Sequence, residues 1–271
     1  MKLKIYGCRG SIPLSHSFDK RFGGNTSCIK LSVGNYSIAV DAGSGLVNLG
    51  HDICVGGGEP KGPQDILLSH LHMDHIIGLS VFAPGLAEKH GIRVFTVSRD
   101  DRSLAEQVFG VFQPPYWPLT LKEAMYAELI EIFEDKPFAA GPLTITPFAA
   151  SHPDKTMSFH ITDGEKTLVY LLDSEISLMN DTGYARLVEF CKGADMVVFD
   201  AAYSPEDYEK YRGWGHSTVL DGIRLRKDSG CKHMLFSHFA QKYSDEDILS
   251  WREYFDGNHY TFASDDMEIE L

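Results

Sequence analysis

The sequence predicts an α/β fold in which two β-sheets pack against each other and helices cover them. Short apolar or alternating runs bounded by Gly, Asn or Asp recur along the chain, which is the pattern of strands. Segments with helical spacing lie mainly between the later runs. Elements with one apolar face are stable only when packed in layers, so this mixture favours a two-sheet sandwich. We see no linker in the 271 residues and expect a single domain spanning residues 1–271.

Strands are expected wherever a short apolar or alternating run is bounded by turn residues. The runs on either side of Gly34 and Asn35 are typical of a β-hairpin, because a Gly-Asn pair suits a two-residue turn. The expected strands are residues 2–6, 27–33, 36–43, 65–69, 92–97, 143–149, 158–162, 167–172, 196–200 and 233–238.

Helical spacing predicts a second set of elements. A helix is expected to begin at the apolar stretch "HIIGLSVF", which starts at His75. Ser217 and Ser244 are plausible N-caps, since a serine hydroxyl accepts a hydrogen bond from the first helical turn. The Pro-rich stretch "FQPPYWPL" at 112–119 is expected to form an ordered loop or lid. The other expected helices are 101–110, 119–131, 182–192, 217–228 and 245–255.

Composition narrows the class of function. The formal net charge of -13 repels polyanions, which disfavours a broad nucleic-acid surface. Any phosphate group must therefore bind at a small, local cationic site. Five widely spaced cysteines without a C-x-x-C pair favour reduced thiols and a cytoplasmic protein. No apolar run approaches the roughly 18 residues that a membrane span needs, so no membrane association is expected.

The stretch "SHLHMDH" at 69–75 concentrates metal-binding side chains directly after an apolar strand. His70 and His72 are two residues apart on an extended backbone and therefore point to the same side. Asp74 and His75 fall where the next helix begins. The first two can share one cation while the last two face another. A polar loop of merely exposed histidines is the competing interpretation, but this spacing suits a metal site better.

Three further candidate ligands follow later strands. His152 comes after 143–149, Asp173 after 167–172, and His238 after 233–237. Each alone could be a capped loop residue or a histidine at the edge of the core. Together they share the carboxyl end of an apolar strand, where the sites of sheet-based folds gather. Seven ligands exceed what one tetrahedral ion takes, so we expect two ions bridged by Asp173.

These motifs together resemble the metallo-β-lactamase superfamily. Its H-x-H-x-D-H signature stands at 70–75, and the separate His, Asp and His follow in the family's order. The resemblance implies an αββα sandwich of two mixed sheets flanked by helices. True β-lactamases of this fold have Cys where Asp173 stands, so antibiotic hydrolysis is not expected. The implied ligands are His70, His72 and His152 for one ion, Asp74, His75 and His238 for the other, and Asp173 between them.

The ligand types favour zinc, although manganese and iron also bind histidine and carboxylate. The cofactor is therefore expected to be two divalent ions.

Two further segments are similar to the ribonuclease Z and cyclic-phosphodiesterase branch of the superfamily. "GHST" at 215–218 implies that His216 is a proton donor, paired with Asp200 where ribonuclease Z has Glu. The opening "GCRGSIP…FGGNTS" aligns Asn25 with an Asn of that branch. A surface histidine near a helix start, and an aspartate that simply ends its strand, are the alternatives for His216 and Asp200. The branch also implies a homodimer.

The resulting hypothesis is a dinuclear phosphodiesterase. Two cations about 3.5–4 Å apart would supply hydroxide for attack on the phosphorus, and His216 would protonate the leaving oxygen. Asp74 could orient the hydroxide, and Asp200 could fix the His216 tautomer. We find no Gly- and basic-rich arm for tRNA, and with the acidic charge this favours a small cyclic or linear nucleotide diester.

Two alternatives remain open at this level. A lactonase or thioesterase of the glyoxalase type shares the seven ligands without needing the His216–Asp200 pair. A non-catalytic nucleotide-binding member would be expected to have lost ligands, and none is missing.

Substrate contacts are assigned to a few residues near the implied site. Asn25 and the backbone near Ser11 could hydrogen-bond phosphate, while Tyr116 and Trp214 could stack on a base. Packing of these aromatic rings under a loop is the competing interpretation.

Overall fold

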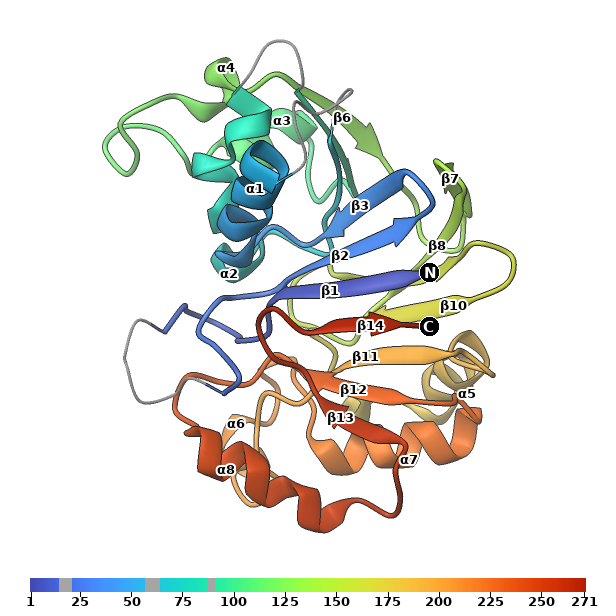
Figure 1. The fold of residues 1–271 in the computed structure, drawn as a ribbon. Helices are drawn as coiled ribbons and strands as arrows, with labels where there is room; N and C mark the ends of the chain where they lie inside the picture. Colours follow the sequence, from blue (N-terminus) through green and yellow to red (C-terminus); the bar gives the residue numbers. More distant parts are fainter. Residues whose placement is uncertain (15–20, 57–63, 87–90) are drawn as a thin grey trace.

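Two seven-stranded β-sheets form the centre of the computed structural model, which describes residues 1–14, 21–56, 64–86 and 91–271. The first sheet has the order β14-β1-β2-β3-β4-β5-β6, and the second β13-β12-β11-β10-β9-β8-β7. Both sheets are mixed: β3 to β6 and β10 to β13 pair in parallel, and the remaining neighbours pair antiparallel. Helices flank both sheets (Figure 1), so the predicted αββα sandwich is confirmed.

The strands are mostly short, and several lie at sheet edges. The first sheet consists of β1 (Lys2–Gly7), β2 (Cys28–Val33), β3 (Tyr36–Val40), β4 (Gln64–Leu67), β5 (Ile92–Thr96), β6 (Ala127–Glu131) and β14 (Glu268–Glu270). The second consists of β7 (Phe138–Ala140), β8 (Leu143–Ala149), β9 (Met157–Thr162), β10 (Thr167–Leu171), β11 (Met196–Asp200), β12 (Met234–Ser237) and β13 (Tyr260–Phe262).

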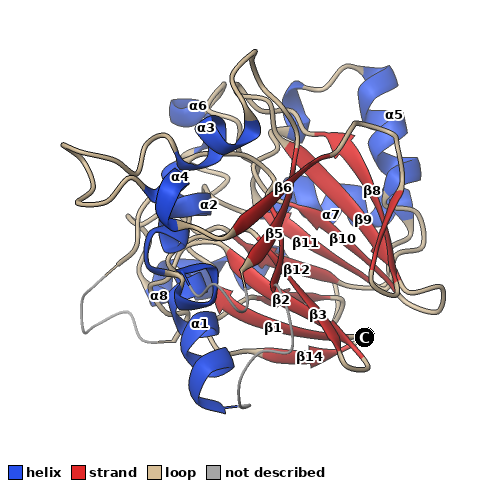
Figure 2. Cartoon of the chain, turned by 90° about the horizontal axis from the view of Figure 1, so that it is seen from above, coloured by secondary structure: helices blue, strands red, loops and turns tan. Residues whose placement is uncertain are grey.

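The helices form two groups (Figures 1 and 2). Beside the first sheet lie α1 (Gly45–Gly56), α2 (Met73–Ile76), η1 (Ile77–Val81), η2 (Ala83–Leu86), α3 (Leu104–Phe109) and α4 (Leu121–Ala124). The later chain supplies η3 (Ile176–Leu178), α5 (Asp181–Phe190), α6 (Tyr208–Tyr211), α7 (Val219–Ser229), α8 (Asp245–Ser250) and η4 (Trp251–Tyr254). None of the helices in the described ranges is long and apolar enough to cross a membrane.

The hydrophobic core has two layers because successive residues of a strand point to opposite faces. In β4, Ile66 packs in the cluster under the first group of helices, whereas Leu67 packs in the cluster between the two sheets. Both side chains are fully buried. A strand covered on both faces needs a continuous apolar run, and Ile66, Leu67 and Leu68 form one at the end of β4.

Several local predictions are confirmed. Residues Gly34 and Asn35 form the two-residue turn of a hairpin in which Val33 pairs with Tyr36, and Gly34 has φ = 58°. Ser244 caps α8 and forms a capping box with Asp247. A helix does begin within the stretch 69–75, at Met73 and not at His75, but α2 ends at Ile76 and the chain continues as the 3₁₀ helix η1.

The helix predicted at 119–131 is wrong. Only Leu121–Ala124 is helical, and Ala127–Glu131 forms the edge strand β6, which pairs in parallel with β5. The segment "AELIE" alternates as well as showing helical spacing, and its pairing with β5 decides between the two. The N-cap of α7 is also Thr218 and not Ser217, since the Thr218 side chain accepts from the backbone of Asp221.

Sequence reasoning missed one long helix and four short strands. Helix α1 buries Leu46 and Leu49, but three glycines in the segment weaken its helical pattern. The missed strands β6, β7, β13 and β14 are outer strands of three to five residues, too short for a periodic pattern to stand out.

We predict that Leu168→Ala in β10 lowers the free energy of unfolding by about 2–5 kcal/mol, because it leaves a cavity in the layer between the sheets. Leu220→Ala, at a side chain that is 45% exposed on α7, should change it by less than about 1 kcal/mol. Urea denaturation measures the unfolding free energy of both variants. Equal losses in Leu168→Ala and Leu220→Ala would contradict the placement of Leu168 in the core.

Candidate metal centre

The predicted ligands lie where the strands of both sheets end. His70, His72, Asp74 and His75 follow β4 in the first sheet. His152, Asp173 and His238 follow β8, β10 and β12 in the second. Asp173 and His238 have positive φ angles of 51° and 65°, which are uncommon for residues other than glycine. The turn at each strand end aims the side chain at the same place, and such backbone strain clusters at functional sites.

The structure brings all seven predicted ligands together. His70, His72, His152 and Asp173 form one group whose potential ligand atoms lie within 4.8 Å of one another, and Asp74, His75 and His238 form a second. Asp173 lies between the groups. Its Oδ1 is 3.6 Å from His70 Nε2 and 3.5 Å from His238 Nε2, and its Oδ2 is 3.1 Å from His75 Nε2.

The residues present fit divalent cations. Five buried atoms in the two groups have no hydrogen-bond partner, namely the Nε2 atoms of His70, His75, His152 and His238 and the Oδ2 atom of Asp173. An unpaired buried polar atom costs roughly 1–3 kcal/mol, so five facing one another call for a ligand. Imidazole nitrogen and carboxylate oxygen are donors for zinc, manganese or iron.

The other ring nitrogen of each of these four histidines, Nδ1, contacts a neighbouring polar group. Nδ1 of His70 lies 3.1 Å from Ser69 Oγ, and Nδ1 of His238 lies 3.0 Å from Ser27 Oγ. Nδ1 of His152 donates to the carbonyl oxygen of Gly215 at 3.1 Å. Such contacts fix the ring orientation and the tautomer.

His72 is oriented the other way round. Its Nε2 lies 2.6 Å from Asp154 Oδ2, which leaves Nδ1 as the atom available to an ion.

Asp41 is a functional residue that the sequence reasoning missed. Its fully buried carboxylate lies 2.7 Å from His75 Nδ1 and accepts hydrogen bonds from the Tyr170 hydroxyl and from the backbone and hydroxyl of Ser69. Because Ser69 Oγ donates to Asp41, it accepts from His70 Nδ1. One carboxylate therefore orients two ligands. Asp41 follows β3 directly, so the strand-end rule that found Asp173 could have found it too.

The electrostatics of the centre favour bound cations. Burial, reinforced by His75, holds the pKa of His70 well below its usual value, so its imidazole is neutral and able to coordinate. Burial opposes ionisation of Asp173, but the neighbouring His238, His75 and His70 lower its pKa well below the ordinary range. Burial lowers the pKa of His75, yet Asp173, Asp74 and Asp41 raise it well above normal overall. The carboxylates thus concentrate negative charge that attracts positive charge.

His216 and Asp200 lie next to the candidate ligands and contact each other. His216 Nδ1 is 2.8 Å from Asp200 Oδ2, and the His216 ring lies 5.1 Å from the ring of His238 and 5.5 Å from that of His152. Burial lowers the pKa of His216, but Asp200, with smaller contributions from Asp173 and Asp74, more than offsets this and raises the pKa to about 9. Asp200 thus favours the protonated form of the ring at the edge of the centre.

Glu175 is a second residue that the sequence reasoning missed. Its buried carboxylate accepts hydrogen bonds from the backbone N–H groups of Gly213 and Gly215 and from the Tyr208 hydroxyl. It thereby holds the loop that carries His216. At Gly215, with φ = 93°, a Cβ atom would lie 2.0 Å from His152 Nδ1, so the loop approaches the ligand as closely as only glycine permits.

The predicted substrate-binding residues are placed less uniformly. The Ser11 backbone N–H donates to Asp74 Oδ2 at 2.7 Å, which puts this loop beside the centre. Trp214 is 61% exposed, lies two residues before His216 and packs on Tyr211. Tyr116 is 82% exposed in the loop between α3 and α4.

Asn25 has its side chain engaged within the protein. Its Nδ2 donates to Asp265 Oδ2 at 2.9 Å and its Oδ1 accepts from Ser44 Oγ. These contacts give Asn25 a role in holding its own loop.

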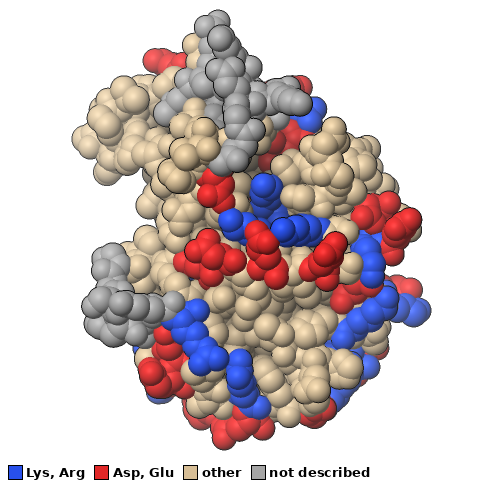
Figure 3. All heavy atoms as spheres, in the orientation of Figure 1, with Lys and Arg blue, Asp and Glu red and all other residues tan. Residues whose placement is uncertain are grey.

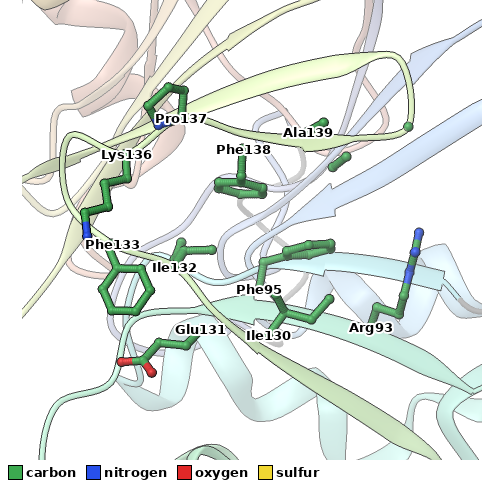
Figure 4. A pocket seen from close by; sticks show the side chains of 12 residues that line it. Arg93, Phe95, Ile130, Glu131, Ile132, Phe133, Lys136, Pro137, Phe138 and Ala139 are labelled. Atoms are coloured by element: carbon green, nitrogen blue, oxygen red, sulfur yellow. The ribbon is translucent and has the colours of Figure 1, made fainter.

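A separate cavity of about 420 Å³ lies between the outer strands β6 and β7. Figure 4 shows Phe95, Phe133 and Phe138 around it. None of the candidate ligands lines this cavity, so it is not part of the metal centre.

Comparison with known proteins agrees with this geometry. Residues 37–239 match the family described as "Beta-lactamase superfamily domain". A probable metallo-hydrolase of Bacillus subtilis, YhfI, is 28% identical over 242 residues, which cover 88% of this chain and 86% of that protein. A ribonuclease Z from a Bradyrhizobium species is 23% identical, covering 92% and 93% of the two chains.

Solved structures show the same fold. The crystal structure of YhfI, a metallo-beta-lactamase fold protein, superposes with a TM-score of 0.73 at 23% identity, covering 99% of this chain and 98% of that chain. A diphosphatase from the PhnP family superposes with a TM-score of 0.70 at 16% identity, covering 100% and 97%.

We predict that Asp41→Asn weakens zinc binding about 10–100-fold, because the amide cannot hold His75 and Ser69 in the same orientation. Competition with a chromophoric chelator measures the affinity. Asp65→Asn, which alters a buried carboxylate of β4 that pairs with Arg93 away from the centre, is the matched control and should leave the affinity unchanged. Equal losses in the two variants would contradict the role of Asp41.

A second prediction concerns Asp265, the partner of Asn25. Burial raises its pKa to about 6, and the N–H donors of Asn25 and Gly24 offset only part of this. A carboxyl whose folded-state pKa is raised stabilises the fold when protonated, and that stabilisation is lost as the pH rises through about 6. Between about pH 5 and about pH 8 the wild type should lose roughly 1–1.5 kcal/mol of unfolding free energy relative to Asp265→Asn. Urea denaturation measures the unfolding free energies. A difference between wild type and Asp265→Asn that is the same at both pH values would refute the prediction.

Proposed function

Because the chain belongs to the beta-lactamase superfamily, we propose that it is a metal-dependent phosphodiesterase that hydrolyses a small cyclic or linear nucleotide phosphodiester. The observation that carries the proposal is the His216–Asp200 pair, 2.8 Å apart and next to the candidate ligands. A thioester hydrolase needs the same ligands, but its thiolate leaving group departs without protonation, whereas the alkoxide of a phosphodiester or a lactone needs a proton. The pair therefore favours an alkoxide leaving group over a thiolate, and the relatives named for phosphate chemistry favour a phosphodiester over a lactone.

The ligands divide between two ions. His70, His72 and His152 would hold one, Asp74, His75 and His238 the other, and Asp173 lies between them. When bound, two divalent ions supply positive charge for the phosphoryl oxygens and lower the pKa of water toward neutrality. Zinc is the metal that this donor set favours, with manganese and iron as alternatives.

His216 is placed to give a proton to the leaving oxygen. Since Nδ1 is engaged by Asp200, the proton available for transfer is the one on Nε2. The contact with Asp200 favours the protonated form of the ring. Asp200 is itself positioned by the backbone N–H of Ala202, 2.9 Å from its Oδ1. The dyad thus has a fixed tautomer and a fixed direction of donation.

Asp74 has a second task beside ligation. The Ser11 backbone N–H donates to its Oδ2, which is also 3.3 Å from His75 Nε2. This contact fixes the carboxylate facing the place where substrate and water meet, and it ties the Ser11 loop to the centre.

The charge of the molecule supports a small substrate. With a net charge of -13, an extended polyanion would be repelled over most of the surface. On the face shown in Figure 3, basic side chains are interspersed with acidic ones and form no continuous patch. The relatives include a ribonuclease Z, whose name supports phosphodiester chemistry, and a diphosphatase, whose title supports small phosphate substrates.

We predict that His216→Ala lowers kcat on a diester with an alkoxide leaving group, such as a cyclic mononucleotide, by about 10²–10⁴-fold. On a 4-nitrophenyl diester the loss should be less than about 10-fold, because nitrophenolate leaves without protonation. Steady-state kinetics on the zinc-loaded protein measures both, with His51→Ala on the exposed side of α1 as the control.

Two results would contradict the proposal. Equal losses on the two diesters would remove the acid role of His216. Faster hydrolysis of a lactone or thioester than of any diester would remove the phosphodiesterase assignment itself.

A further inference from the structure

A groove of about 700 Å³ opens beside the candidate metal centre. His72 forms part of its wall, so the groove borders the first group of candidate ligands at this residue. The rest of the wall comes from the start of α2, from the loop after β5, from α3, and from the two residues that follow Pro153. A substrate held at the centre would extend into this space.

The acidic side chains of the groove are already engaged. Asp154 Oδ2 lies 2.6 Å from His72 Nε2. Asp100 accepts three hydrogen bonds from the guanidinium of Arg102, at 3.1, 3.0 and 2.6 Å. Glu106 accepts from Ser103 and pairs with Lys122. Each of these carboxylates therefore has a hydrogen-bond or ion-pair partner other than Arg99 or Lys155.

Two cations of the groove lack such a partner. Lys155 Nζ donates to the carbonyl oxygen of Ser98 at 2.8 Å, and Arg99 donates to the carbonyl oxygens of Val97 and Ser69. Within the ranges that the structure describes, no carboxylate lies within 4.0 Å of either cation. The Nε atom of Arg99 is buried and has no hydrogen-bond partner. Asp41 and Asp154 act on Arg99 only from beyond salt-bridge distance. In a chain of net charge -13, two cations without a salt bridge beside one candidate ligand favour a local anion site.

The same groove also offers apolar surface. Met73 is 43% exposed and Val111 is 42% exposed, and both line it, together with Leu71 and Ile76. Large apolar side chains left exposed in a concave site suit a ligand with a flat or apolar group. The groove thus combines a surface for a base with a place for an anion.

We propose that this groove binds the part of the substrate beyond the scissile diester, and that this part carries a second phosphate next to a nucleobase. A guanidinium and an ammonium together suit a phosphomonoester, which carries close to two negative charges at neutral pH. The substrate class is then a nucleotide diester with an additional phosphomonoester, and Lys155 and Arg99 determine specificity for it. The inference rests on the proposed function and names the substrate class of that site.

The test is equilibrium binding to the zinc-loaded, full-length protein by calorimetry. The probes are adenosine 3′,5′-bisphosphate and adenosine 5′-monophosphate. Wild type should bind the bisphosphate at least about 10-fold more tightly than the monophosphate, as expected for a charged hydrogen bond to a second phosphate. Lys155→Met should bring the ratio of the two dissociation constants close to one, and Lys155→Arg should keep most of the preference.

Lys192→Met is the matched control, because Lys192 pairs with Glu189 on the surface of α5. It should keep the wild-type ratio. Arg99→Lys is a second variant that retains the charge while losing the fork of donors, and it should lower the ratio in part. Equal binding of the two probes to wild type, or a ratio unchanged by Lys155→Met, would overturn the inference.

Hydrolysis of bis(4-nitrophenyl) phosphate separates this inference from the proposed function, because that diester carries no second phosphate. If wild type hydrolyses this diester but binds the two probes equally, the phosphodiesterase assignment stands and the groove is not a site for a second phosphate. A bisphosphate preference lost in Lys155→Met, without turnover of any diester, refutes the phosphodiesterase assignment and supports the groove as a phosphate site.

Discussion

Five buried polar atoms without a hydrogen-bond partner face one another at the strand ends, and the rest of the site is arranged around them. Four are imidazole nitrogens and one is a carboxylate oxygen, contributed from both sheets. Desolvated groups of this kind destabilise a fold unless something coordinates them. The chain supplies carboxylates that draw in positive charge, and a cation satisfies several unpaired atoms at once. This constraint links the packing of the sandwich to metal chemistry.

The sheet register supplies the required convergence. In the second sheet Leu171 pairs with Phe199 and Asp200 pairs with Ser237, so β10, β11 and β12 end nearly level. Asp173, Asp200 and His238 follow from that alignment as neighbours at one edge. Behind them, Asp41 orients His75 through Nδ1 and Glu175 holds the loop of His216. The candidate ligands and the His216–Asp200 pair are therefore held in place by a supporting layer of buried carboxylates.

The sequence predicts the buried strands and the ligands for the same physical reason. A strand covered on both faces, such as β10 or β12, is mostly apolar, and a charged or imidazole side chain just after it is conspicuous. This is how His70, Asp173 and His238 could be found. Edge strands carry no such signal, so the spacing of residues 127–131 predicts a helix where β6 forms. Asp41 follows β3 and carries the same positional signal as Asp173, but its contacts and those of Glu175 are tertiary contacts that spacing does not encode. The groove cations Arg99 and Lys155 are distant in sequence. Only the structure shows that they line one groove and that neither forms a salt bridge with any residue it describes.

The most direct test of this account is anomalous X-ray diffraction from crystals of the zinc-loaded protein, with data collected on both sides of the zinc absorption edge. The account predicts two anomalous peaks, one among His70, His72 and His152 and one among Asp74, His75 and His238, with Asp173 between them. Peaks elsewhere, or no peak at the strand ends in crystals that contain zinc, would contradict it.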